Sequence, residues 1–230
     1  MIELQLLDGF EVRRDGAAVT LPQSACRLIA FLALHERPLR RSYVAGSLWL
    51  ESTEAHANAS LRSTLWRLGR HGFALIDADG SLVRLAPEVT IDLHEVQEQA
   101  RAVLGDERAT AEILRRLCLA GELLPGWYDD WVVIERERFR QLRLHALDSL
   151  CETLTGVGRY AAAIEAGCAA VAAEPLRETA HRLLIAAYLA AGNRREAIRR
   201  YRLFRDLLEA ELALAPSAQL EELVAPLPVW

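Results

Sequence analysis

The feature that most restricts the fold of this 230-residue chain is a repeat with a period of 34 residues near its C-terminus. Residues 158–164, Gly-Arg-Tyr-Ala-Ala-Ala-Ile, match residues 192–198, Gly-Asn-Arg-Arg-Glu-Ala-Ile. Three further pairs of residues keep the same offset: Leu150 and Leu184, Leu154 and Tyr188, and Ala163 and Ala197. Glycine separates two predicted helices in each copy, and alanine allows paired helices to approach closely. The spacing therefore predicts stacked pairs of helices.

This period resembles that of the tetratricopeptide repeat. Pro175 stands where the first copy ends, whereas the second copy has Glu209 there, and Pro216 follows seven residues later. Two copies alone do not bury a continuous core, so we expect helices within residues 92–156 to complete the layer. An unrelated helical bundle with a chance similarity is the alternative.

The first 85 residues predict short strands, three helices and a hairpin. Asp79-Gly80 is the dipeptide that most favours a tight hairpin turn, and Gly72 is expected to end the third helix. Three helices followed by a hairpin are typical of a winged helix-turn-helix, although a hairpin of an α/β enzyme has the same pattern. The expected strands cover residues 2–7, 10–13 and 18–21, the helices about 24–35, 41–49 and 54–70, and the hairpin 73–85.

Asp92, followed three residues later by Glu95, matches the capping-box pattern that opens a helix. From there to the end the chain is predicted to be helical. We therefore place the boundary just after Pro87 and expect a winged-helix domain of residues 1–90 and an all-α, tetratricopeptide-like domain of residues 91–230. The fold class is mainly α with a small β component.

The third predicted helix is amphipathic. Leu61, Leu65 and Leu68 lie on one side at 3.6 residues per turn. Polar and aromatic side chains occupy the other side: Arg62, Ser63, Trp66, Arg67 and Arg70. A helix with this pattern is suited to lie against DNA, although most charged helix faces are simply solvated.

We expect Arg62 and Arg67 to read guanine edges, because arginine pairs with the O6 and N7 atoms of guanine. Ser63 and Thr64 carry hydroxyls that suit bases or phosphates. Arg70, near the end of the helix, is better placed for a phosphate than for a base edge.

Four further residues complete the candidate DNA surface. Arg40 and Arg41 open the second helix and are expected to hold the phosphate backbone. Arg84 lies on the second hairpin strand, where it is suited to enter a minor groove. For Trp66 three roles stay open: contact with a thymine methyl or a sugar, shielding of the hairpin, or a place at the edge of the core.

Charge is distributed unevenly along the chain. Residues 37–70 hold six arginines and two glutamates, a net charge of +4, while the whole chain carries −5 and the remainder therefore −9. A local basic surface on an acidic molecule suits a protein that reads short DNA sites.

The chemistry of an enzyme is not evident. All 27 basic residues are arginine, which excludes the usual forms of Walker ATPases, kinases and Schiff-base enzymes, since each needs a lysine. The six histidines are separated, and Asp129-Asp130 and Glu135 with Glu137 stand where helix starts attract acids. We therefore expect a non-enzyme without a metal or cofactor.

Four scattered cysteines without CxxC pairs suit a reducing compartment. The chain has no apolar run of about 20 residues and no secretory signal, so we expect a cytoplasmic protein that does not contact the membrane.

In the order and spacing of these features, the chain resembles the Streptomyces antibiotic regulatory protein (SARP) family of bacterial activators. These proteins join an OmpR-type winged helix to a bacterial transcriptional activator domain. The resemblance rests on residues 7–12, Asp15-Gly16, Leu48-Trp49, 58–70, 91–94, Trp131, 135–138, 175–177 and 192–201. The chain departs from the family at Gly69, where an arginine is usual, and at Leu50-Glu51, where an acidic or proline-containing turn is usual.

The resemblance implies a sequence-specific transcriptional activator, associated with the nucleoid, that binds direct repeats in double-stranded promoter DNA. It also implies two protomers in tandem on DNA and contact between the helical domain and RNA polymerase holoenzyme. Two alternatives stay open: a repressor, and a protein-interaction adaptor whose winged helix no longer binds DNA.

Overall fold

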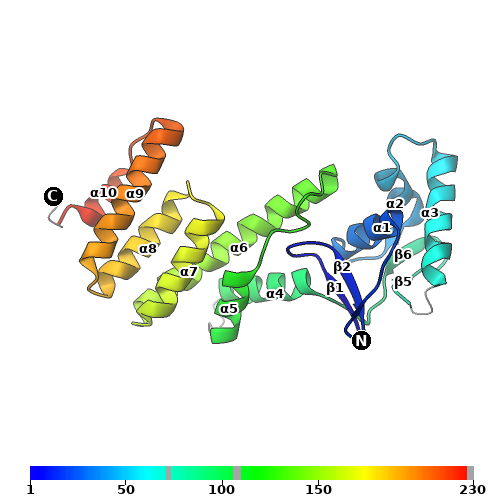
Figure 1. Cartoon of the computed structure of the whole chain (residues 1–230), viewed down its shortest axis with the longest axis horizontal. Coiled ribbons are helices and arrows are strands. Elements are labelled where there is room, and N and C mark those ends of the chain that lie inside the picture. The colour runs from blue at the N-terminus through cyan, green and yellow to red at the C-terminus, as the bar shows by residue number, and fades with distance from the viewer. Residues whose placement is uncertain (71–73, 106–109, 227–230) are drawn as a thin grey trace. The chain divides into compact units, whose positions relative to one another are not determined.

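The computed structural model describes residues 1–70, 74–105 and 110–226 (Figure 1). The chain forms two compact units, Met1–Glu95 with Gly121–Glu137, and Val96–Ala120 with Arg138–Trp230. The first unit thus includes residues 121–137, which lie beyond the boundary expected near residue 90. Within the described parts, no helix combines the length and apolar character needed to cross a bilayer.

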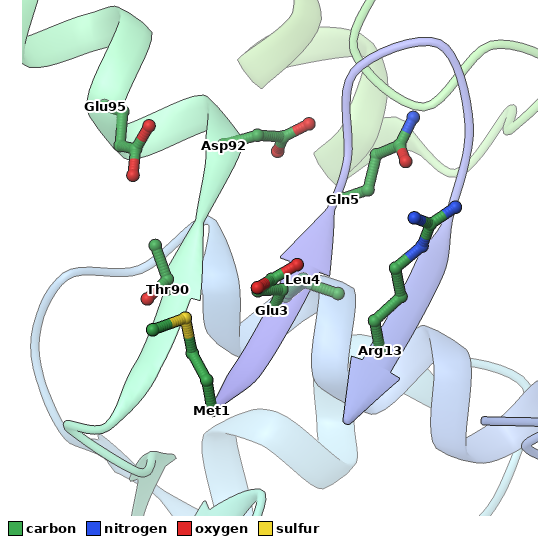
Figure 2. A pocket seen from close by; sticks show the side chains of 8 residues that line it. All are labelled: Met1, Glu3, Leu4, Gln5, Arg13, Thr90, Asp92 and Glu95. Carbon is green, nitrogen blue, oxygen red and sulfur yellow. The ribbon is translucent and has the colours of Figure 1, made fainter. Parts of the chain in front are cut away.

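The first unit contains a four-stranded sheet with the order β3-β2-β1-β7. Its strands are β1 (Ile2–Gln5), β2 (Glu11–Arg14), β3 (Ala17–Ala18) and β7 (Val89–Ile91). Strand β1 is antiparallel to β2 and parallel to β7, so that Leu4 lies opposite Val12 and Ile91. These three side chains are buried, whereas Glu3 and Arg13 occupy the other, exposed face (Figure 2). The short strand β7 was not predicted from the sequence.

Three helices and a smaller sheet complete the winged helix. The helices are α1 (Gln23–Ala33), α2 (Arg41–Leu48) and α3 (Glu54–Gly69). The sheet has the order β4-β6-β5, formed by β4 (Leu39–Arg40), β5 (Ile76–Asp77) and β6 (Leu82–Leu85). The predicted helices and hairpin are therefore confirmed. Gly72, the expected helix stop, and residue 73, the expected start of the hairpin, lie outside the described residues.

Asp92 connects the large sheet to the first helix of the C-terminal half, α4 (Asp92–Leu104). Its carboxylate accepts hydrogen bonds from the N–H groups of Leu6 at 2.9 Å, Leu7 at 3.1 Å and Leu93 at 2.7 Å. Figure 2 shows the carboxyl group directed from the start of α4 toward β1. The capping-box pattern predicted a bond within the helix, whereas two of these bonds reach 85 and 86 residues back along the chain.

The remaining described elements are helices: α5 (Ala111–Leu119), α6 (Asp130–Gly156), α7 (Tyr160–Ala173), α8 (Glu178–Ala190), α9 (Arg194–Leu212) and α10 (Ala218–Val224). In the second unit α7 packs against α8, and α8 packs against α9 (Figure 1). An all-helical second half was predicted and is confirmed.

The 34-residue repeat is visible in the backbone. Gly158 and Gly192 both have φ of +75°, a left-handed conformation that favours glycine. In each copy the N–H group of the next residue donates to a carbonyl five residues back at 2.8 Å, from Arg159 to Leu154 and from Asn193 to Tyr188. The offset pairs predicted from the sequence are all buried: Leu150 and Leu184, Leu154 and Tyr188, and Ala163 and Ala197.

Candidate nucleic-acid interface

Helix α3 is held by its buried side and by a cap at its N-terminus. The Thr53 side chain accepts a hydrogen bond from the His56 N–H group, and Glu54 lies in the first turn, where the helix dipole favours an acid. Leu61 and Leu68 are buried, as the leucine pattern predicts, and Leu65 is half-buried. The opposite side of the helix is therefore fixed toward solvent.

The exposed side carries the predicted cations. Arg62, Arg67 and Arg70 are exposed. The Arg67 Nη2 atom donates to Ser63 Oγ at 3.0 Å, and the Arg70 guanidinium lies 5.0 Å from the centre of the Trp66 ring. Trp66 is 64% exposed, which excludes the core as its place. The cation–π contact gives Arg70 a flat aromatic support at the surface.

Thr64 does not lie on this surface, and its expected contact with DNA is wrong. Its side chain is only 3% exposed, and its hydroxyl donates to the carbonyl of Ser60 at 2.9 Å. The physical reason is the helical period, which places Thr64 three residues after the buried Leu61 and four before the buried Leu68. The bond to the helix backbone satisfies the buried hydroxyl.

The two arginines at the start of α2 differ in their surroundings. Arg40 is exposed, whereas Arg41 is half-buried and its backbone N–H group donates to the carbonyl of Ser81 in the hairpin turn at 2.8 Å. The Arg41 Nε atom is buried and has no hydrogen-bond partner among the described residues. Arg41 therefore lies partly against protein, and Arg40 is the more available of the two cations.

Arg84 on the hairpin is already paired. Its Nε and Nη2 atoms donate to one oxygen of Asp77 at 2.9 and 2.7 Å across the β5–β6 pair. Both side chains are exposed, 48% for Arg84 and 42% for Asp77. The cation that was predicted to enter a minor groove thus has a carboxylate beside it, which reduces its attraction for phosphate.

The elements that carry these side chains are joined within the first unit. Strand β4, with Arg40, pairs with β6, and Arg84 lies on β6 itself. The end of α3 shares a small apolar hollow with β5, lined by Leu65, Leu68 and Ile76 among others. The predicted cations of α2, α3 and the hairpin therefore all lie in the first compact unit.

A second hollow of about 400 Å³ lies over β1, β2 and β7 (Figure 2). Its lining includes the carboxylates of Glu3, Asp92 and Glu95 and a single guanidinium, that of Arg13. An excess of carboxylates repels phosphate, so this hollow is not part of the candidate nucleic-acid surface.

No pattern in the sequence indicated that residues 121–137 pack in the first unit with the winged helix. The N–H group of Leu124 donates to the carbonyl of Leu6 at 2.8 Å, and that of Asp8 donates to the carbonyl of Glu122 at 2.9 Å. Arg27 on α1 pairs with Asp129 at 2.6 Å. The Asp129-Asp130 cluster thus supplies a tertiary ion pair in addition to the helix start that was predicted there.

Aromatic rings extend this contact. Trp131 meets Phe31 of α1 edge-on with 5.2 Å between ring centres, and Trp127 lies 5.6 Å from Phe10. Two tryptophans spaced by one helical turn were the available signal in the sequence, but they did not identify their partners.

Comparison with known proteins agrees with this architecture. The family model of the bacterial transcriptional activator domain matches residues 91–227. The regulatory protein AfsR of Streptomyces coelicolor is 30% identical over 222 residues, which cover 91% of this chain and 22% of that protein. AfsR of Streptomyces griseus is 31% identical over 229 residues, which cover 94% of this chain and 23% of that protein. The chain therefore spans about a fifth of the length of these curated relatives.

A solved structure has the same fold. EmbR of Mycobacterium tuberculosis, determined in complex with a low-affinity phosphopeptide, superimposes with a TM-score of 0.72 at 23% identity. The match covers 100% of this chain and 66% of EmbR.

Proposed function

Because this chain belongs to the bacterial transcriptional activator domain family, we propose that it is a SARP-type transcriptional regulator that binds double-stranded promoter DNA. One observation carries the DNA-binding part of the proposal. Arg62, Arg67 and Arg70 are exposed together on α3, while the leucine side of the same helix is fixed in the core. A rigid helix that presents arginines at this spacing suits the major groove, which admits an α-helix.

The side chains have different roles in this proposal. Arg62 and Arg67 read base edges, and Ser63 positions Arg67 through their hydrogen bond. Arg70, supported by Trp66, contacts a phosphate or sugar near the end of the helix.

The flanks of the surface contact the backbone of the DNA. Arg40, Arg41 and Arg84 supply cations from the start of α2 and from the hairpin. Thr64 has no contact with DNA in this proposal, since it is buried.

The proposal is tested by gel retardation with a fragment from upstream of the genes beside this one, at several salt concentrations. The wild type should retard the fragment with an affinity that falls as salt rises. Arg62→Ala with Arg67→Ala should lose at least tenfold in affinity, since each bidentate base contact contributes about 1–3 kcal/mol. The control is Arg115→Ala with Arg116→Ala on α5, which removes the same charge from another surface and should bind normally.

Equal binding by the Arg62/Arg67 variant and the wild type would show that α3 does not read the site. Absence of a specific shift with any upstream fragment would contradict DNA binding itself and favour the adaptor alternative.

We further propose activation, in which two protomers bind direct repeats in tandem and the helical unit contacts RNA polymerase holoenzyme. Family membership supports this part of the proposal. In vitro transcription with and without the protein tests whether it activates or represses. We expect the amount of transcript to rise, and a fall would identify a repressor. A footprint over two repeats, as opposed to one, tests the tandem arrangement.

A further inference from the structure

Helix α9 separates its charges along its length. Residues 194–205 hold six arginines and one glutamate, a net charge of +5, whereas residues 206–212 hold three acids and no base, a net charge of −3. The buried stripe of the helix consists of Ala197, Tyr201, Phe204 and Leu208. The opposite side is exposed and includes Arg195, Arg199, Leu203, Asp206 and Glu209.

Neither the stability of the helix nor its solubility requires this arrangement. Cations at the N-terminus of a helix oppose the helix dipole, yet Arg194 and Arg195 are in the first turn. Neither side chain has an ion pair or hydrogen bond to any residue in the described ranges, whereas Glu196 pairs with Arg199 and Arg200 further along the helix. A helix near the end of a repeat stack needs a polar outer face, but interspersed charges would serve that purpose. The separated charges therefore point to a partner.

We infer that the exposed face of α9 binds the same face of a second copy of this chain, with the two helices antiparallel about a two-fold axis. An antiparallel pair places the basic half of one helix against the acidic half of the other. Centred near residue 202 or 203, it sets Arg199 against Asp206 of the partner subunit and Arg195 against Glu209 of the partner subunit. Two-fold symmetry repeats each pairing.

The apolar residue on this face lies at the centre of the pair. Leu203 is 53% exposed, and the symmetry brings it against its own copy. Two ion pairs within the helix involve residues of this face, Arg205 with Asp206 at 2.8 Å and Arg199 with Glu196 at 3.3 Å. They do not prevent the arrangement, because exposed pairs contribute little and exchange readily.

A groove beside the acidic half suits an arginine of the second copy. It has a volume of about 430 Å³, and its lining includes three carboxylates, Asp206, Glu209 and Glu221, one guanidinium, that of Arg205, and the apolar Leu214 and Pro216. The carboxylates outnumber the single cation, so the groove keeps an excess of negative charge. The aliphatic part of an arginine packs on such an apolar wall while its guanidinium bonds to carboxylates. In the antiparallel register, the first turn of the partner's α9 reaches this groove.

DNA fits this face less well than a second copy. A phosphate backbone that followed the arginines along α9 would meet the three acids of residues 206–212 one turn later. The proposal is also independent of the DNA-binding surface: it uses no residue of α2, α3 or the hairpin, and its two-fold axis relates the α9 helices and not the winged helices on direct repeats.

Sedimentation equilibrium of the full chain at low salt tests the inference with a charge exchange. Arg195→Glu with Arg199→Glu makes the face acidic throughout, and Asp206→Arg with Glu209→Arg makes it basic throughout. Each variant alone should weaken self-association at least tenfold, whereas an equimolar mixture should form a heterodimer about as stable as the wild-type dimer. Raising salt should weaken the wild-type dimer, because screening reduces exposed ion pairs.

The control is Arg115→Glu with Arg116→Glu, a reversal of the same size on α5 that should leave self-association unchanged. Circular dichroism melting confirms that each variant is folded. A wild type that is monomeric throughout, or a mixture that stays monomeric, would overturn the inference. Loss of DNA affinity in the acidic variant at unchanged mass would overturn it too and assign the arginines to phosphate.

Discussion

Three arginines of the candidate DNA surface each have a different side chain beside them. Arg67 donates to Ser63, Arg70 lies over Trp66, and Arg84 is bound by Asp77. The first two contacts keep the full positive charge at the surface, whereas the third places a negative charge beside it. At the scale of single residues, the side chain beside an arginine therefore affects how strongly that arginine can bind a phosphate.

Asp77→Asn should tighten DNA binding several-fold, because it releases Arg84 from an exposed ion pair that contributes at most about 1 kcal/mol. Asp79→Asn is the matched control, since it removes one negative charge from the hairpin without touching Arg84. Fluorescence anisotropy with a labelled promoter fragment measures both. Equal gains in the two variants would mean that only the net charge of the hairpin matters.

Gly69 is the position at which the chain lacks an arginine that is usual in the family. It is exposed at the end of α3, and a Cβ atom added there meets no atom within 4 Å. Steric crowding therefore does not require glycine, which costs up to about 1 kcal/mol relative to alanine in a helix.

Gly69→Arg should raise affinity for promoter DNA several-fold by adding a phosphate contact. Gly69→Glu gains a similar helix propensity and adds the opposite charge, so it should weaken binding. The same anisotropy titration compares them. Tighter binding by both variants would mean that helix stability, and not phosphate contact, limits the affinity.

Among the elements, the helical repeat has a histidine within its core. His181 on α8 is 5% exposed, its Nε2 atom lies 2.9 Å from the carbonyl of Pro175, and its ring stacks on Phe204 with 4.1 Å between centres. Burial lowers the pKa of His181 from its usual value, with a smaller effect from nearby Arg200. The folded state therefore favours the neutral ring.

Acidification should destabilise the helical unit through His181. A histidine titrates near 6.5 when the chain is unfolded, so below that pH the unfolded state binds more protons and the free energy of unfolding falls. Above that pH this contribution is fully present. His181→Gln, which keeps a donor for Pro175, should show a smaller loss of stability between about pH 7.5 and pH 5.5 than the wild type.

Urea unfolding followed by circular dichroism at both pH values measures the difference. His145→Gln on α6 is the control, because it removes an exposed histidine and leaves the buried one in place. A His181→Gln variant with the wild-type pH dependence would show that other groups control the response.

At the scale of the whole molecule, each compact unit is made of two separate segments of the chain. Residues 121–137 contribute backbone hydrogen bonds, an ion pair and two tryptophans to the first unit, although residues 96–120 before them belong to the second. The winged helix is therefore completed by a segment of the matched activator domain. Stability of the winged helix should depend on that segment.

Trp131→Ala should lower the free energy of unfolding by about 3 kcal/mol, since it removes the ring that packs edge-on against Phe31. Trp66→Ala is the matched control and should change stability by less than about 0.5 kcal/mol, because that ring is exposed. Chemical unfolding measures both. Equal, small effects would mean that residues 121–137 do not stabilise the winged helix.

The sequence alone determined the features that depend on residues close together in the chain. The leucine spacing of α3, the Asp79-Gly80 turn and the 34-residue repeat predicted helices, hairpin and stacked pairs, because periodicity and turn chemistry act over a few residues. The exposed arginines of α3 followed from the same periodicity. Thr64 was misplaced because its polar type outweighed its position on the buried stripe, where a backbone carbonyl satisfies its hydroxyl.

Tertiary structure alone decided the contacts between distant residues. It paired β7 with β1, bound Asp92 to Leu6 and Leu7, and brought residues 121–137 to the winged helix. It also placed Asp77 against Arg84 across the hairpin. These contacts depend on which buried surfaces and backbone groups meet when the chain folds, and no local pattern in the sequence encodes a partner 85 residues away.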